Sequence, residues 1–233
     1  MVSEKADCCI LISAGAEWRA ILPHFLEAEI TSTPYGETFR AVIVNQQVHF
    51  LHGGWGKVAA AGSTQYAIDR WAPKRIINLG SCGGFAGEVT RGAVILAEKT
   101  LIYDIIEQMS DPEAAIEQYT VRFNLGWLPT PPPQPVLGKT LVSADRDIVP
   151  EDIPSLIDKY GASAADWESG AIAWVARKNN LPCLILRGVS DLVDATEAEA
   201  YGNYAFFEDQ CREIMGRFVQ HLPAWLEAFS VVE

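Results

Sequence analysis

Three carboxylates stand next to predicted strand or helix boundaries, where α/β proteins usually hold reactive side chains. Asp191 follows an apolar run, Cys183–Val189, that predicts a strand. Glu168 stands at the start of a predicted helix, and Glu17 follows the first strand-like run. A carboxyl partly buried at the end of a strand has a raised pKa and can act as a general acid. Acids in these positions could therefore donate or accept protons during a reaction.

Each acid also has a structural explanation. Ser190 and Asp191 are both residue types that cap helices and turns well. The negative charges of Glu168 and Glu17 are favourable at the start of a helix because of the helix dipole. The spacing alone therefore favours a structural role for each of the three acids.

The acids need a scaffold of alternating strands and helices, and the hydrophobic pattern supplies one. The predicted strands are Cys8–Ala14, Phe39–Val44, Val48–Leu51, Arg75–Asn78, Gly92–Ala97, Thr140–Ser143 and Cys183–Val189. The predicted helices are Glu17 to about Leu26, Lys57–Trp71, Ile153–Tyr160, Trp167–Asn179 and Phe206–Leu222, with a break at Pro223. The proline-containing segment Glu107–Val136 is predicted to be an irregular connection. No linker divides the chain, so residues 1–233 predict a single α/β domain.

Composition excludes several classes of partner. The formal net charge is −12 and no cluster of Lys and Arg occurs, which argues against binding to nucleic acid or an anionic membrane. No apolar run is long enough to span a membrane, and the polar, acidic residues 1–7 are unlike a secretory signal. We therefore expect a cytoplasmic protein with a small polar or purine-like ligand. No Cys-x-x-Cys pair occurs, and His49 and His52 would face opposite sides of a strand, so no metal site is predicted.

Two glycine-rich segments follow predicted strands. Gly54–Ala59 fits the dinucleotide pattern G-x-G-x-x-A, but that pattern needs an acid at the end of the next strand. The next strand, Arg75–Asn78, is followed by Leu79, Gly80 and Ser81, so we expect no nicotinamide or other organic cofactor. The second segment, Gly80–Gly84, predicts a turn whose N–H groups and Ser81 hydroxyl could hold a water, an anion or a sugar hydroxyl.

Four motifs in the correct order resemble the purine nucleoside phosphorylase and nucleosidase superfamily. The sequence is most similar to its methylthioadenosine/S-adenosylhomocysteine nucleosidase branch. The similar segments are Gly54–Ala61 (G-x-G-K-x-x-A-A), Ile76–Gly84 (I-N-x-G-S-A-G-G), Asp166–Ala171 (E/D-M-E-x-x-A) and Arg187–Asp191 (R-x-x-S-D). The resemblance covers nearly the whole chain. It implies a mixed, twisted central β-sheet flanked by helices, a homodimer, and cleavage of the N-glycosidic bond of a purine nucleoside without a metal or cofactor.

The resemblance also implies a role for individual residues. Asp191, held by Ser190, would protonate N7 of the leaving purine, and Glu17 would deprotonate the attacking water. Glu168 would accept hydrogen bonds from the ribose hydroxyls. The other residues implied to bind substrate are Ser81 and Gly83 beside the water and ribose, Trp167 against the sugar, and Ile148 and Tyr201 beside the base. An acid on the leaving group and a base for water are what glycosidic cleavage through an oxocarbenium-like transition state requires.

Two alternatives remain open from the sequence. A different register aligns Gly15 and Arg19 with the phosphate-binding motif of the phosphorylases, which would make phosphate the nucleophile. The second phosphate-binding arginine of those enzymes corresponds to Asn78, and with only one arginine left we favour water. The second alternative is a nucleoside-binding protein without activity. It is motivated by Asp147, which stands where the family has a base-stacking phenylalanine.

Overall fold

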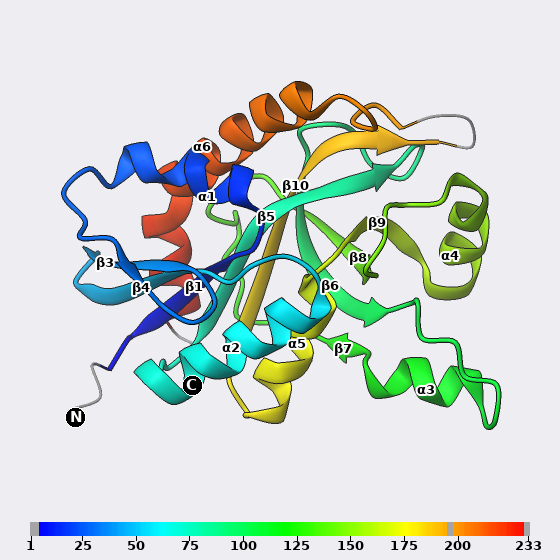
Figure 1. Ribbon diagram of the computed structural model, residues 1–233, viewed down its shortest axis with the longest axis horizontal. Helices are drawn as coiled ribbons and strands as arrows, with labels where there is room; N and C mark the ends of the chain where they lie inside the picture. Colours follow the sequence, from blue (N-terminus) through cyan, green and yellow to red (C-terminus); the bar gives the residue numbers. More distant parts are fainter. Residues whose placement is uncertain (1–4, 195–197, 231–233) are drawn as a thin grey trace.

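The computed structural model describes residues 5–194 and 198–230, and in these residues ten strands form one mixed sheet covered by helices on both faces (Figure 1). The predicted α/β fold is confirmed. The strands are β1 Cys8–Ile12, β2 Thr31–Ser32, β3 Glu37–Ile43, β4 Gln46–His52, β5 Ile76–Phe85, β6 Val94–Ile102, β7 Val121–Arg122, β8 Leu137–Ser143, β9 Ala162–Asp166 and β10 Cys183–Val193. The helices are α1 Gly15–Ile21, α2 Lys57–Trp71, α3 Pro112–Gln118, α4 Ile153–Tyr160, α5 Ser169–Lys178 and α6 Tyr204–Phe229, with short 3-10 turns at Leu22–His24 and Pro150–Asp152.

Strand β5 joins the two halves of the sheet. Along one edge it pairs in parallel with β10; along the other it pairs first with β1 and, at Gly83 and Gly84, with β9. The pairings β5–β9–β8–β6–β10–β5 close into a ring, while β1, β4, β3 and β2 extend from it as an open sheet. Since β1, β5 and β10 run parallel side by side, their carboxyl ends meet at one edge, which is where α/β proteins bind ligands.

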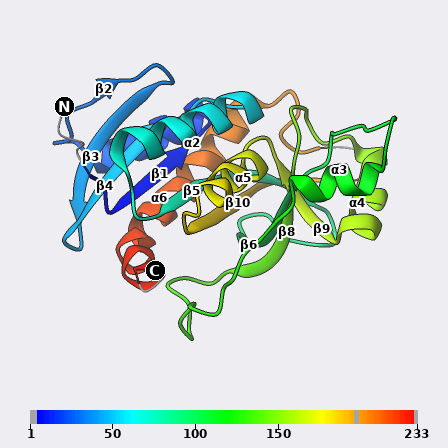
Figure 2. The same ribbon diagram turned by 90° about the horizontal axis from the view of Figure 1, so that it is seen from below.

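Side chains of the central strands alternate between two cores. Cys8, Ile10 and Ile12 of β1 belong to the core that contains α1 and α6, whereas Cys9 and Leu11 belong to the core beneath α2 and α5. Helix α1 packs against α6, and α2 packs beside α5 on the other face of the sheet (Figure 2). The two-residue period of the strand thus decides which helix pair each side chain contacts.

Several strands are longer than predicted, among them β5 and β10, and the predicted turn at Gly80–Gly84 is wrong. These glycines lie inside β5, which continues to Phe85, and β10 continues to Val193. The glycines are needed for close approach: a Cβ at Gly80 would lie 1.9 Å from Arg187 Nη1. In β10 the register against β5 shifts at Ser190, because Val189 pairs with Cys82 while Asp191 pairs with Gly83. This bulge changes the direction in which Ser190 and Asp191 point.

Three other element predictions need correction. Helix α6 continues through Pro223 instead of breaking there, because Trp225, Leu226 and Phe229 beyond it are buried in the core. Their burial outweighs the roughly 3 kcal/mol cost of an internal proline. The helix predicted from Glu17 to about Leu26 begins at Gly15 and is α-helical only to Ile21. The predicted irregular segment contains α3 and β7, and the Ala-rich strand β9 was not predicted because its residues lack a strong strand preference.

No helix among the described residues is both long enough and apolar enough to cross a membrane.

Replacing Gly80 by alanine is expected to destabilise the fold. The added Cβ would lie 1.9 Å from Arg187 Nη1 and 2.9 Å from Glu17 Oε1, so buried charged side chains would have to move. We expect Gly80→Ala to lower the free energy of unfolding by about 1–3 kcal/mol, measured by urea denaturation. Gly216→Ala is the matched control, since its Cβ would meet only His24 Nε2 at 3.8 Å and alanine favours helix. Equal unfolding midpoints for Gly80→Ala and the wild type would contradict this packing.

Candidate active site

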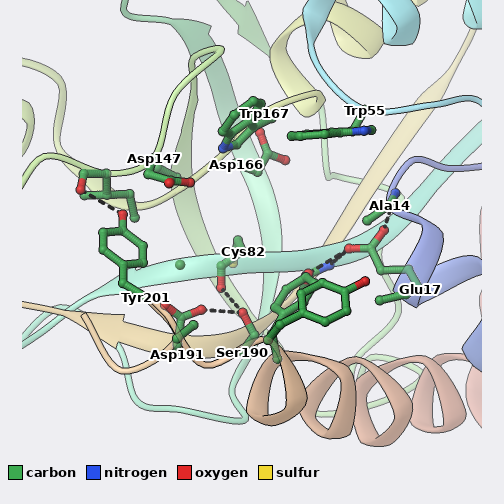
Figure 3. Close-up of a pocket in the computed structure, with 18 of the residues that line it drawn as sticks. Ala14, Glu17, Trp55, Cys82, Asp147, Asp166, Trp167, Ser190, Asp191 and Tyr201 are labelled. Atoms are coloured by element: carbon green, nitrogen blue, oxygen red, sulfur yellow. Dashed lines mark hydrogen bonds between the residues drawn. The ribbon is translucent and has the colours of Figure 1, made fainter.

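A cavity of about 900 Å³ opens at the carboxyl ends of β1, β5 and β10 (Figure 3). All nine residues that the sequence predicted for a site line this cavity. They are Glu17, Ser81, Gly83, Ile148, Trp167, Glu168, Ser190, Asp191 and Tyr201. Residues from both ends of the chain thus meet in one place.

Glu17 is a buried carboxylate held by backbone and side-chain donors. Its Oε1 accepts hydrogen bonds from the Ser81 N–H (2.6 Å) and the Ser81 hydroxyl (2.7 Å). Its Oε2 accepts from the N–H of Ala14, the residue that precedes α1 (3.2 Å). Glu17 is 2% exposed, and these contacts fix its position at the cavity.

Arg187 is a fully buried cation behind the site. Its Nε lies 2.8 Å from Asp166 Oδ2, its Nη2 lies 3.6 Å from Glu168 Oε2, and its Nη1 lies 3.9 Å from Glu17 Oε1. The guanidinium also donates to Asn78 Oδ1 (2.8 Å) and Ser169 Oγ (2.9 Å). One arginine is thus shared by three buried carboxylates, and the charges of the cluster are only partly balanced.

Glu168, one of these carboxyls, has a raised pKa. Burial raises its pKa to about 8, the charges of Asp166 and Glu17 act in the same direction, and Arg187 opposes them. Glu168 precedes α5, and its Oε1 accepts from the N–H of Gly56 (3.0 Å). The segment Gly54–Ala59, which fits the dinucleotide pattern, therefore positions the carboxyl of Glu168. In its protonated form Glu168 offers both a donor and an acceptor to a diol.

Asp191 lies on the bulge of β10 next to Ser190. The Ser190 hydroxyl is 2.6 Å from Asp191 Oδ1 and 3.2 Å from the Cys82 carbonyl oxygen. Burial raises the pKa of Asp191, and the negative charges of Glu199 and Asp147 raise it further. The hydrogen bond from Ser190 acts in the opposite direction and lowers the pKa. A carboxyl with a raised pKa keeps its proton to higher pH, as a general acid requires. The bulge orients this acid, with Ser190 holding one of its oxygens.

The segment around Ile148 forms one end of the cavity. The Tyr201 hydroxyl donates to the Ile148 carbonyl oxygen (2.8 Å), and burial is the main cause of the raised pKa of Tyr201. The Ile148 side chain packs over Gly83, where a Cβ would lie 2.6 Å from Ile148 Cδ1. Gly83 is therefore required to be glycine by this contact.

Two tryptophans line the opposite wall. The Trp55 and Trp167 rings are 5.0 Å apart at 42°, and Trp55 is 67% exposed. Figure 3 shows both rings across the cavity from Ser190 and Glu17. The pair supplies apolar surface for a sugar or its substituent.

The side chains of the alternative phosphate-binding residues are engaged by other groups of the protein. The Arg19 side chain is 58% exposed; it pairs with Glu208 of α6 (2.6 Å) and donates to the hydroxyl of Tyr204 (3.2 Å), a residue that lines the cavity. Asn78 is fully buried between the Leu11 carbonyl and Arg187. Gly15 lines the cavity, but it contributes no side chain.

Sequence reasoning missed several residues that build the site. Asp166 accepts from Ser143 Oγ (2.6 Å) and from the N–H groups of Glu168 and Ser169 (both 3.2 Å), so it fixes the start of α5. Its position two residues before Glu168 was the available signal. Trp55 is the exposed residue of a glycine-rich loop, which is also a signal for a site. No pattern in the sequence indicated that Arg187 would reach all three carboxylates. Other unpredicted residues at the cavity include Ala14, Cys82, Arg146, Asn203, Tyr204 and Phe207.

Across residues 5–194 and 198–230, no group of three or more His, Cys, Asp and Glu side chains is arranged to hold a metal ion.

Fold and sequence comparisons agree on the class of protein. A model of the phosphorylase superfamily matches residues 8–149 and 133–223. The chain therefore belongs to the phosphorylase superfamily, as its four motifs predicted.

Proteins similar to this chain include nucleosidases. The chain is 27% identical over 206 residues to the 5′-methylthioadenosine/S-adenosylhomocysteine nucleosidase of Bacillus cytotoxicus, covering 78% of this chain and 84% of that protein. Among solved structures, a Helicobacter pylori nucleosidase with 5′-methylthioadenosine in its active site has a TM-score of 0.77 at 18% identity, covering 93% of this chain and 98% of the other. A futalosine hydrolase mutant of the same species has a TM-score of 0.73 at 18% identity, covering 92% and 97%. At these identities the structural matches confirm the fold.

Proposed function

We propose that this protein hydrolyses the N-glycosidic bond of a purine nucleoside, with a 5′-thioadenosine of the methylthioadenosine or S-adenosylhomocysteine type as substrate. The observation that carries the proposal is the pair of buried carboxyls at one cavity, Glu17 beside Ser81 and Asp191 beside Ser190. The nucleosidase relatives support the choice of substrate.

In the proposed reaction, Glu17 acts on the attacking water and Asp191 acts on the leaving purine. Water attacks C1′ of the ribose while the bond from C1′ to N9 breaks, and the sugar passes through an oxocarbenium-like state. Glu17 accepts a proton from the water, and Asp191 gives its proton to N7, so the purine leaves neutral. Glu168 binds the ribose hydroxyls, which holds C1′ against the water.

Water is favoured over phosphate as the nucleophile. The N–H and hydroxyl of Ser81, which would suit an anion, both donate to Glu17 Oε1. Arg187 is shared by three carboxylates, and the charge of Arg19 is already paired with Glu208. A phosphate at this position would lie against a carboxylate without a cation of its own.

The apolar wall suits a nucleoside with an uncharged 5′ substituent. Trp55 and Trp167 offer ring faces, and thioether sulfur makes favourable contacts with aromatic rings. We also propose a homodimer, in which a neighbouring subunit would cover the exposed side of Trp55.

The test is release of base from a panel of nucleosides, followed by absorbance and chromatography. We expect 5′-methylthioadenosine to be cleaved with higher kcat/KM than adenosine, because only its 5′-methylthio group would contact the rings of Trp55 and Trp167. Binding of these nucleosides, seen as a rise in Tm, without release of base from any of them would contradict hydrolysis and favour a binding protein.

A further inference from the structure

Asp147 is an acid that the cavity leaves without a partner. It lines the cavity beside Ile148, and its side chain makes no hydrogen bond or ion pair within the described part of the chain. The neighbouring Arg146, which also lines the cavity, pairs with Asp152 and lies over the Tyr103 ring, 5.6 Å from its centroid. Figure 3 shows the Asp147 carboxylate on the cavity side, across from Tyr201.

The backbone that carries Asp147 is held in place. The next residue, Ile148, is clamped by the Tyr201 hydroxyl at its carbonyl oxygen (2.8 Å) and packs its side chain over Gly83. The carbonyl of Ile148, a natural acceptor for a ligand, is thus already engaged by the protein. The Asp147 carboxylate is the unpaired acceptor next to it.

Asp147 also shares this end of the cavity with the proposed acid. After burial, the negative charge of Asp147 is among the causes of the raised pKa of both Asp191 and Tyr201. If N7 of a purine faces Asp191, the next group around the rim of the base is the substituent at C6. With N7 at Asp191, a base that extends toward Ile148 would bring this substituent to the part of the cavity that Asp147 lines.

We infer that Asp147 selects the base by accepting a hydrogen bond from an amino group at C6, an inference that rests on the proposed binding of a purine nucleoside in this cavity. An ionised carboxylate can only accept hydrogen bonds. A 6-amino group donates, whereas a 6-oxo group only accepts and would face the carboxylate unfavourably. Because Asp147 is exposed, we expect discrimination of about 10–100-fold, below the 10⁴–10⁵-fold of fully buried polar sites.

The experiment compares Asp147→Asn with the wild type on 5′-methylthioadenosine and 5′-methylthioinosine, which differ in the 6-amino and 6-oxo groups and in the proton that the 6-oxo base carries at N1. The wild type should prefer the amino compound by about 10–100-fold in kcat/KM. Asp147→Asn should lose most of that preference, because an amide can donate to the 6-oxo group. Glu151→Gln is the matched control, since it removes one exposed acid from the same loop and should keep the wild-type preference.

Calorimetric binding of adenine and hypoxanthine separates this inference from the proposed reaction. If no nucleoside is cleaved but adenine binds more tightly than hypoxanthine, and Asp147→Asn removes the difference, selection by Asp147 stands and hydrolysis fails. If base is released but Asp147→Asn keeps the wild-type preference, selection by Asp147 is wrong. A wild-type preference for the 6-oxo compound would also overturn it. Asp147→Ser repeats the test with a shorter side chain, and equal Tm values show that each variant is folded.

Discussion

Asp191→Asn is expected to lower kcat for base release by about 10²–10⁴-fold, the usual contribution of a general acid. An amide has the shape of the carboxyl and can still accept from Ser190 Oγ, which lies 2.6 Å from Asp191 Oδ1. It cannot transfer a proton to N7 of the leaving purine. The loss should therefore appear in kcat, measured by steady-state release of adenine.

Binding and stability should change little in this variant. The dissociation constant for 5′-methylthioadenosine, measured by calorimetry, should stay within a few-fold of the wild-type value. Because burial disfavours the charged form of Asp191, a neutral amide should not lower Tm at neutral pH. Asp209→Asn, an exposed acid paired with Arg212 on the surface, is the control and should keep full activity. An Asp191→Asn variant with nearly wild-type kcat would show that Asp191 is not the acid.

Glu17→Gln should lower kcat by a similar factor, about 10²–10⁴-fold, because the base that accepts the proton of water is lost. Glutamine is chosen because its oxygen can still accept from the N–H and hydroxyl of Ser81. Its amide nitrogen would face the Ala14 N–H, and that unpaired donor should cost about 1–3 kcal/mol of stability. Steady-state release of adenine measures the first effect, and denaturation measures the second.

Glu208→Gln is the matched control for Glu17→Gln. Glu208 of α6 pairs with Arg19 of α1 at 2.6 Å, and its side chain is 37% exposed. Removing this charge should leave kcat unchanged. If Glu17→Gln and Glu208→Gln lose activity equally, the loss follows from the change in net charge, and the assignment of Glu17 as the base is wrong.

How much of the site was predictable differs between its acids. Asp191, Ser190 and Glu168 stand in short motifs next to strand and helix boundaries, so the sequence indicated that they share a site. Their chemical roles were implied only by the resemblance to the nucleosidases. The bulge that orients Asp191 was not predictable, because it depends on the register between β10 and β5. A local pattern carries no information about how two distant strands pair.

The central role of β5 shows the same limit. The sequence around Gly80 predicts a turn, because glycine is common where the chain reverses. In the fold these glycines make room for Arg187 and Ile148, which come from distant parts of the chain. The alternation of strands and helices was predictable from the spacing of hydrophobic residues. Which distant side chains lie against the glycines of β5 depends on how the elements pack together.

The most direct test of the account identifies the sugar product. The protein is incubated with 5′-methylthioadenosine in phosphate-free buffer and in phosphate buffer. The products are then separated by chromatography and identified by mass spectrometry. We predict equal rates of adenine release in both buffers and free 5-methylthioribose as the sugar in each. Adenine release that requires phosphate, with a sugar 1-phosphate as the product, would contradict it.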